Sequence, residues 1–209
     1  MSDEGLFVDH VIYGCVDIDA TAERLLRDYG LGSVPGGRHL GGTTNRIIPL
    51  EPPTFFELLG IGDTSLADGA WLAEVLDGQD RVLWWALGTN DIDESARRRG
   101  LPVQHGTMEM ANGTTAAFRT AGMPRYPLPF FVAPELDDAG RLALWQERYD
   151  ASGHESSPGA YTFVEAREPA EYLTAWLGDH GLDIRHTPTP GHGISKVGIQ
   201  TARGEIVLE

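Results

Sequence analysis

The chain has 209 residues, of which 41% are hydrophobic, and this is enough to bury one sizeable core or two small ones. Its 31 acidic and 16 basic side chains give a formal net charge of −15, which argues against nucleic acid and anionic membranes as partners. The sequence contains neither a signal-peptide pattern nor an apolar run of about 18 residues, so we expect no membrane span. A single cysteine, Cys15, excludes an internal disulfide and fits a cytoplasmic location.

The first sixty residues predict a strand, a helix and three further strands. Residues 7–16 are rich in β-branched and aromatic side chains, which favours a strand. We expect Asp19 to cap the helix that follows and Gly30 to end it. A glycine-rich loop then leads into residues 46–50 and 54–59, which predict an antiparallel pair with prolines at the turn.

Two polar side chains interrupt these apolar strands. His10 lies in the first strand, and Glu57 stands in the last one between Phe55, Phe56, Leu58 and Leu59. A carboxylate in so apolar a setting is costly unless a partner or a metal ion accompanies it. We therefore expect His10 and Glu57 to belong to a functional site.

The segments DHV, PGGRH, GTTN and FELL, in this order, resemble the vicinal oxygen chelate superfamily and, within it, the glyoxalase-like domain proteins. The resemblance covers residues 7–61 and implies a βαβββ module that curls into an open cup together with a second module. In that superfamily, side chains on the first and fourth strands of each module hold a metal ion. His10 and Glu57 fall at these two positions, so the resemblance implies a divalent metal such as Zn, Ni, Mn or Fe.

A second copy of the pattern follows a connecting helix that is expected to end at Gly78. Its predicted elements are a strand at residues 81–89, a helix at 91–99, and strands at 102–110, 114–122 and 128–134. A turn at residues 122–127 separates the last two strands. Such repetition indicates modules that pair as pseudo-symmetric units.

A third, shorter copy closes the sequence. Its predicted elements are a strand at residues 160–166, a helix opened by Glu168 and Pro169, and strands at 182–190, 194–202 and 204–209. The last two strands are expected to form a hairpin through Arg203 and Gly204. The first module could close its cup with either later copy, and the sequence leaves both possibilities open.

We therefore predict an α+β fold in which repeated βαβββ modules form a curved mixed-sheet cup, similar to glyoxalase and bleomycin-resistance proteins. The first module is placed at residues 1–61, the connecting helix and second module at 62–134, a linker at 135–158, and the third module at 159–209. All are expected to form one compact body. Apolar positions in the middle of the linker predict one or two helical turns that fold back on this compact body.

The second module departs from the metal-binding pattern. When residues 16–18 are aligned with residues 90–92, His10 falls on Trp84, and the position of Glu57 falls on Phe131 or Val132. Neither residue type binds a divalent cation. His105, in a strand of the second module, is the candidate for a third metal ligand.

Residues around the glycine-rich loop are candidates for contacts with a substrate. His39 is a candidate catalytic residue beside Glu57, and Thr44 and Asn45 offer hydrogen bonds. Arg38, or Arg46 nearby, is a candidate partner for a substrate carboxylate.

Trp84 is the candidate for an apolar wall of the cup. Since neighbouring residues on a strand face opposite sides, only one of Trp84 and Trp85 can line the interior.

Two functions remain open. In the first, the protein is a lyase or isomerase whose metal polarises a small organic substrate while a carboxylate or histidine moves a proton. In the second, the cup encloses an apolar small molecule without a metal, as in sequestering resistance proteins, and His10 and Glu57 form a hydrogen-bonded pair. Either function is compatible with a monomer or a homodimer.

Overall fold

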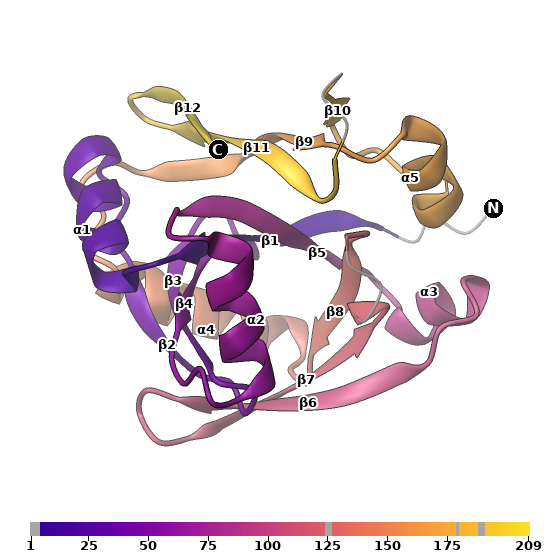
Figure 1. Cartoon of the computed structure of the whole chain (residues 1–209), viewed down its shortest axis with the longest axis horizontal. Helices are drawn as coiled ribbons and strands as arrows, with labels where there is room; N and C mark the ends of the chain where they lie inside the picture. The colour runs from indigo at the N-terminus through magenta and orange to yellow at the C-terminus, as the bar shows by residue number, and fades with distance from the viewer. Residues whose placement is uncertain (1–4, 124–126, 179, 188–190) are drawn as a thin grey trace.

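The computed structural model describes residues 5–123, 127–178, 180–187 and 191–209, and its elements follow one another as the sequence predicts (Figure 1). The strands of the first two modules are β1 (Phe7–Cys15), β2 (Val34–Arg38), β3 (Thr43–Pro49), β4 (Phe55–Ile61), β5 (Arg81–Gly88), β6 (Val103–Met110), β7 (Thr115–Ala121) and β8 (Phe130–Pro134). Later strands are β9 (Pro158–Ala166), β10 (Ile184–His186), β11 (Ile194–Thr201) and β12 (Gly204–Leu208). The helices are α1 (Ile18–Tyr29), α2 (Ala67–Leu76), α3 (Ile92–Arg98), α4 (Asp138–Ala151) and α5 (Ala170–Leu177). The turn expected at residues 122–127 and the end of the strand expected at 182–190 lie partly outside the described residues.

The first module closes with the second and not with the third. Eight strands form a closed barrel in the order β1-β4-β3-β2-β6-β7-β8-β5, and the modules meet where β1 pairs with β5 and where β2 pairs with β6. Within each module the first and fourth strands are parallel, β1 to β4 and β5 to β8. The α+β prediction with repeated βαβββ modules is confirmed, and the cup is a closed barrel.

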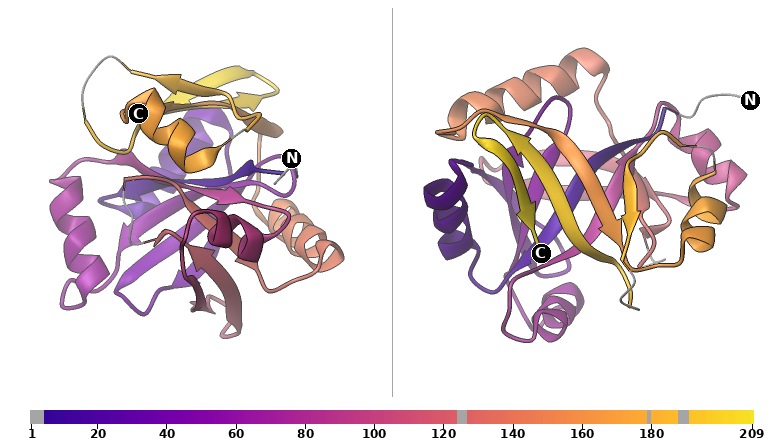
Figure 2. Two further views of the ribbon diagram at one scale, coloured as in Figure 1. Left: turned by 90° about the vertical axis from the view of Figure 1, so that its right-hand side faces the viewer. Right: turned by 90° about the horizontal axis from the view of Figure 1, so that it is seen from above.

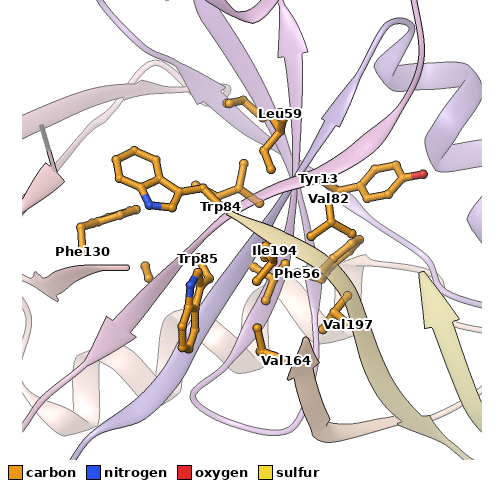
Figure 3. Close-up of a cluster of buried hydrophobic side chains, with 14 of the residues drawn as sticks. Tyr13, Phe56, Leu59, Val82, Trp84, Trp85, Phe130, Val164, Ile194 and Val197 are labelled. Carbon is orange, nitrogen blue, oxygen red and sulfur yellow. The ribbon is translucent and has the colours of Figure 1, made fainter. Parts of the chain in front are cut away.

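The third copy forms a separate sheet outside the barrel. Its strands have the order β10-β9-β11-β12, and this sheet lies across β1 and β5 (Figure 2). Because side chains alternate along β5, Trp84 and Trp85 project to different sides, with Trp84 beside Phe130 and Trp85 toward Val164 (Figure 3). Trp85 is 1% exposed, so the main core lies between the barrel and the third sheet.

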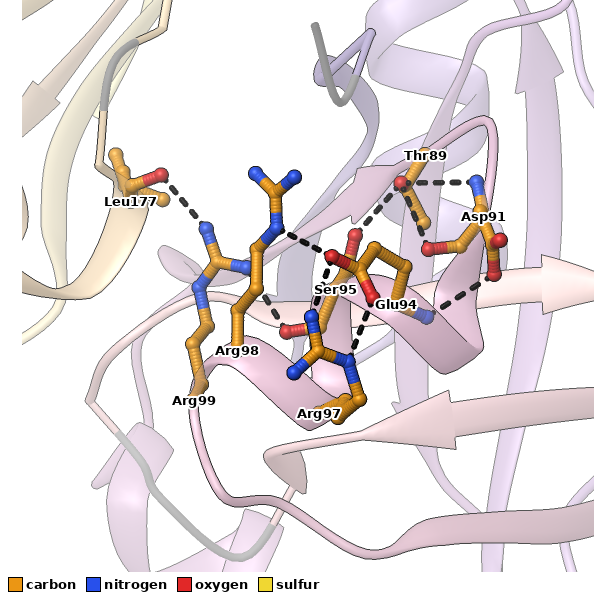
Figure 4. Close-up of polar contacts among 8 residues, drawn as sticks. All are labelled: Thr89, Asp91, Glu94, Ser95, Arg97, Arg98, Arg99 and Leu177. Carbon is orange, nitrogen blue, oxygen red and sulfur yellow. Dashed lines mark hydrogen bonds and ion pairs between the residues drawn. The ribbon is translucent and has the colours of Figure 1, made fainter. Parts of the chain in front are cut away.

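Polar contacts also attach the third copy to the second module. Asp91 caps α3 by accepting a hydrogen bond from the backbone N of Glu94. Arg99, just after this helix, donates to the carbonyl of Leu177 at the end of α5, at 2.6 Å (Figure 4). A guanidinium that donates to helix-terminal carbonyls satisfies groups that the helix itself leaves unpaired.

The cap of α1 differs from the prediction. Asp17, not Asp19, has extended backbone angles and accepts hydrogen bonds from the backbone N of Asp19 and Ala20. The helix therefore begins two residues earlier than predicted, and Asp19 lies in its first turn, where a carboxylate is favourable. Gly30 ends the helix in a left-handed conformation, φ 72°, as expected for a glycine at that place.

The predicted linker is mostly a helix. α4 has 14 residues, more than the one or two turns expected, and it packs on β3. The indole N of Trp145 donates to the carbonyl of Leu50 at 2.9 Å, and His154 bonds both Gly32 and Pro49. These contacts fix α4 over one side of the barrel. Among the described residues, no helix has the length and apolar character needed to cross a membrane.

Candidate functional site in the barrel cavity

The barrel encloses a cavity of about 1380 Å³. All eight of its strands contribute to the lining, and α4 and α2 supply further side chains. Most of the lining is apolar, and a few polar groups converge on one part of the wall, as is usual for small-molecule sites.

The polar groups form one connected chain of contacts. His10 Nδ1 lies 2.7 Å from Asp9 Oδ1, and its Nε2 lies 3.4 Å from Glu57 Oε2. On the far side of the carboxylate, Asn45 Nδ2 donates to Glu57 Oε1 at 2.6 Å. The backbone N of Gly37 donates to Asn45 Oδ1 at 2.7 Å, which fixes the orientation of the amide. Asp9, His10, Asn45 and Glu57 are each buried.

A bulge explains how two consecutive residues contact each other. Neighbouring side chains on a regular strand face opposite sides, but the β1–β5 register shifts between Val8 and His10. The extra residue at this shift is Asp9, and a bulge can redirect a side chain in this way. Asp9 therefore reaches the His10 ring and determines which nitrogen faces Glu57.

The charges around His10 favour its protonated form. Burial alone would lower the pKa of His10, but the hydrogen bond with Asp9 and the negative charges of Glu57 and Asp9 raise it above 6.5. The imidazole also stacks on Phe55, with ring centroids 4.5 Å apart and an interplanar angle of 17°. Its position is therefore held by both carboxylates and by an aromatic face.

Tyr161 of the third copy supports the same wall from behind. Its hydroxyl accepts a hydrogen bond from the backbone N of Val11 and donates one to the carbonyl of Phe55. Val11 and Phe55 flank the His10 site on β1 and β4, so one side chain from β9 connects the two strands there. Burial raises the pKa of Tyr161 well above its usual value, which keeps the hydroxyl neutral.

Gly36 and Gly37 serve this arrangement through close approach. A Cβ at Gly36 would lie 2.1 Å from Asn45 Oδ1, and a Cβ at Gly37 would lie 2.3 Å from the carbonyl O of Glu109. Neither glycine has a positive φ, so glycine is needed at these positions because a Cβ would not fit and not because of the backbone angles. Gly36 leaves room for the amide that holds Glu57, and Gly37 lets β2 approach β6 where the two modules meet.

The register identifies the counterparts of His10 and Glu57 in the second module. Ile12 pairs with Glu57, and its equivalent Ala86 pairs with Phe130. The counterpart of Glu57 is therefore Phe130, one position before the predicted Phe131. Trp84 holds the place of His10, as predicted, and its ring lies 4.7 Å from that of Phe130. Phe130 in turn meets the edge of the His10 ring at 5.9 Å.

The donor set at these four positions does not fit the metal site that the fold implies. Two positions carry possible ligands, His10 and Glu57, and two carry the aromatic rings of Trp84 and Phe130. A catalytic zinc site uses three protein ligands. Within the part of the chain that the structure describes, no three or more His, Cys, Asp or Glu side chains are grouped to hold a metal ion.

His105 does not reach this centre. Its side chain is 72% exposed, and its Nδ1 lies 2.9 Å from Glu135 Oε1 at another part of the cavity wall. His39 also lines the cavity, where its Nδ1 lies 2.8 Å from Thr43 Oγ1. His39 and His105 are thus in the wall without contacting Glu57 in the described structure, and their predicted roles remain untested.

Thr44, Arg38 and Arg46 lie away from the cavity. Alternation along β3 turns Asn45 inward and places Thr44 and Arg46 on the opposite face. Thr44 donates to the carbonyl of Gly37, Arg46 contacts Asp19 and Ser33, and Arg38 is exposed. We therefore leave these three residues out of the proposed site, whereas Asn45 and Trp84 stay in it.

Sequence reasoning missed two cavity-lining arginines on α4, Arg141 and Arg148. They stand about two helical turns apart and therefore on one face, together with Leu144 and Ala151. That spacing is visible in the sequence. The direction of this face depends on how α4 packs on β3, which the spacing does not reveal.

The closed barrel of two βαβββ modules, with a site on their first and fourth strands, defines a protein of the vicinal oxygen chelate fold. The chain belongs to the family described as "Glyoxalase-like domain", whose model matches residues 8–206. No curated protein matches the chain.

Among solved structures, a hypothetical protein from Staphylococcus aureus is similar over 95% of this chain and 92% of its own, at 16% identity and a TM-score of 0.67. Methylmalonyl-CoA epimerase from Mycobacterium tuberculosis is similar over 66% of this chain and 91% of its own, at 16% identity and a TM-score of 0.47. At these identities the likenesses concern the fold alone.

Proposed function

We propose that this protein binds a largely apolar small molecule inside the barrel and moves a proton to or from it, as an isomerase or lyase that works without a resident metal ion. The observation that carries the proposal is the buried chain Asp9–His10–Glu57–Asn45 in the wall of an otherwise apolar cavity. A buried titratable group with a shifted pKa that lines a cavity, here His10, is a common mark of a catalytic site.

Each of the four residues in this chain of polar contacts has a role in the proposal. Glu57 is the base that takes a proton from carbon, and Asn45 holds one of its oxygens in a fixed direction. His10, positioned by Asp9, stabilises the negative charge that develops and returns a proton. The 3.4 Å separation between His10 Nε2 and Glu57 Oε2 lets a proton pass between them and reset the pair.

A second candidate is a binder that does not transform its ligand. The aromatic wall of Trp84 and Phe130 favours it, as does a cavity larger than the roughly 300–1,000 Å³ of most small-molecule sites. In that case, the polar chain would only fix the orientation of the ligand.

Hydrogen–deuterium exchange distinguishes the two candidates. Carbonyl compounds with a C–H next to the carbonyl would be incubated with the protein in D₂O and followed by NMR. We expect a compound that binds to exchange at least about 100-fold faster with wild type than without protein, and Glu57→Gln to abolish this gain. Glu147→Gln, at another cavity-lining carboxylate, is the matched control and should retain it. Compounds that bind in the cavity without any exchange would favour the binder.

A further inference from the structure

Arg148 is a half-buried cation in the cavity wall. Burial lowers its pKa, and the negative charges of Glu147, Glu57 and Asp9 offset part of this effect. An arginine remains protonated under such conditions, since its ordinary pKa lies far above neutral pH. Asp9 and Glu57 influence it from the polar chain, so the guanidinium lies within electrostatic range of the proposed reaction centre.

Arg148 forms no hydrogen bond or ion pair among the described residues, although the charges of Glu147, Glu57 and Asp9 act on it without direct contact. Arg141, on the same face of α4, has partners, because its Nη2 lies 3.8 Å from Asp9 Oδ2 and its guanidinium lies above the ring of Phe7. A partly desolvated guanidinium without a hydrogen-bonded carboxylate is unfavourable, and a ligand that supplies one would relieve this cost.

The surroundings indicate which anion fits. The cavity wall carries the carboxylates of Asp9, Glu57, Asp68, Glu135 and Glu147 and the guanidinium groups of Arg141 and Arg148, so a second negative charge on the ligand would be repelled. A carboxylate carries a single charge and matches the planar guanidinium with two parallel hydrogen bonds.

Apolar side chains at the cavity margin indicate the rest of the ligand. Leu40 is 81% exposed, Leu136 47% and Met123 39%, and all three line the cavity. Exposed apolar groups gathered at a cavity are typical of a site for an apolar body.

We propose that the ligand of this cavity is an apolar monocarboxylic acid whose carboxylate binds Arg148 while its hydrophobic part fills the barrel. This inference rests on the proposed function only in so far as the cavity binds a small molecule. It assigns to α4, an element outside both barrel modules, the recognition of the ligand's charged end.

Matched pairs of compounds test the proposal. Phenylacetate, 1-naphthylacetate and decanoate would each be compared with their neutral amide, and phenyl phosphate would serve as a dianion. Binding would be measured by calorimetry and by the fluorescence of the cavity-lining tryptophans. The variants are Arg148→Met, which keeps an apolar side chain of similar length, Arg148→Lys, and Arg141→Met as a control for a neighbouring positive charge.

We expect wild type to bind at least one carboxylate about tenfold or more tighter than its amide, which corresponds to about 1.4 kcal/mol. Arg148→Met should remove this preference and leave amide binding unchanged, which also shows that the variant is folded. Arg148→Lys should retain part of the preference, and Arg141→Met should retain most of it.

Four results would overturn the proposal. Equal binding of acid and amide by wild type would show that the cavity does not recognise a carboxylate. An unchanged preference in Arg148→Met would show that Arg148 does not recognise it. Neither of these two results would contradict the binding of a small molecule in the cavity. Tighter binding of phenyl phosphate than of every carboxylate would assign another class of anion. Failure of wild type to bind any compound would contradict both this inference and the proposed function, whereas binding without proton exchange would contradict the proposed chemistry alone.

Discussion

The two modules of the barrel place side chains of opposite character around one cavity. In the first module, cavity-lining positions on the parallel strands β1 and β4 carry His10 and Glu57, with Asn45 behind the carboxylate. In the second module, the equivalent positions carry Trp84 and Phe130. The backbone arrangement is the same in both, because β1 pairs with β4 as β5 pairs with β8.

This contrast shows how a pseudo-symmetric scaffold can be divided between two tasks. Polar groups confined to one half leave the other half free to supply an apolar wall. The same division explains why the donor set for a metal ion is incomplete.

Making the second half resemble the first should create a metal site. In the double variant Trp84→His and Phe130→Glu, four ligands would occupy the four equivalent positions. We expect it to bind about one equivalent of Zn²⁺ with a dissociation constant of about 1 μM or lower, worth about 8 kcal/mol. Calorimetry would measure the affinity, with Trp84→His alone as the control. A double variant that folds but binds no metal would contradict the assigned equivalence.

Removing the side chain that holds Glu57 in the first module should destabilise the protein more than the equivalent change in the second module. Asn45→Leu leaves an oxygen of Glu57 and the N–H of Gly37 without their partners, which should lower the free energy of unfolding by roughly 3 kcal/mol. The equivalent residue in the second module is Thr120, since it pairs with Val132 as Asn45 pairs with Leu59. Thr120→Val should cost less than about 1 kcal/mol, because Phe130 there needs no hydrogen bond. Urea denaturation measures the loss of unfolding free energy in each variant. Equal losses in Asn45→Leu and Thr120→Val would contradict a special role for Asn45 in supporting Glu57.

Tyr161 connects the first half to the third sheet. Tyr161→Phe removes the partner of the Val11 N–H and the Phe55 carbonyl, so we expect a loss of about 1–2 kcal/mol in the free energy of unfolding. Tyr172→Phe, at a side chain that is 64% exposed, is the control and should change it by less than about 0.5 kcal/mol. A loss no greater than in the control would show that the hydroxyl does not support the site.

The smallest effect concerns pH. Since the pKa of His10 is raised above 6.5 in the folded protein, its contribution to stability is present below about pH 6.5 and declines as the pH rises through the folded value. The difference in Tm between wild type and His10→Gln should therefore shrink from pH 6 to pH 9. Trp84→Phe, at the equivalent position, should give a difference that does not depend on pH. If the Tm difference between wild type and His10→Gln grew with pH, it would contradict a raised pKa of His10 in the folded protein.

The fold was largely predictable because its signals are local. Apolar alternation and turn residues placed the barrel strands apart from β2, which lies where we predicted a glycine-rich loop, and Gly30 ended α1 as expected. The repeat also put Trp84 at the position of His10. The predicted counterparts of Glu57, Phe131 or Val132, were one or two residues beyond Phe130, because the register of β8 depends on the connection before it, whose length has no counterpart in the first module.

The parts of the site that the sequence did not predict depend on contacts between distant segments. Tyr161 is 106 positions from Phe55 and 150 from Val11, and neither strand carries a mark of this contact. Asp9 contacts His10 only because of a bulge at the β1–β5 seam. Arg148 belongs to a helix whose position over the barrel is decided by its contacts with β3 and with Leu50, which follows that strand.

Protein groups, and not a metal ion, complete the pair of His10 and Glu57 in the function that we propose. The metal content of the purified protein, together with its Tm with and without a chelator, tests this directly. We expect far less than one equivalent of metal per chain and the same Tm under both conditions. One equivalent of a divalent metal, with a clear fall in Tm on chelation, would contradict it, because an ion bound only to the folded state stabilises that state.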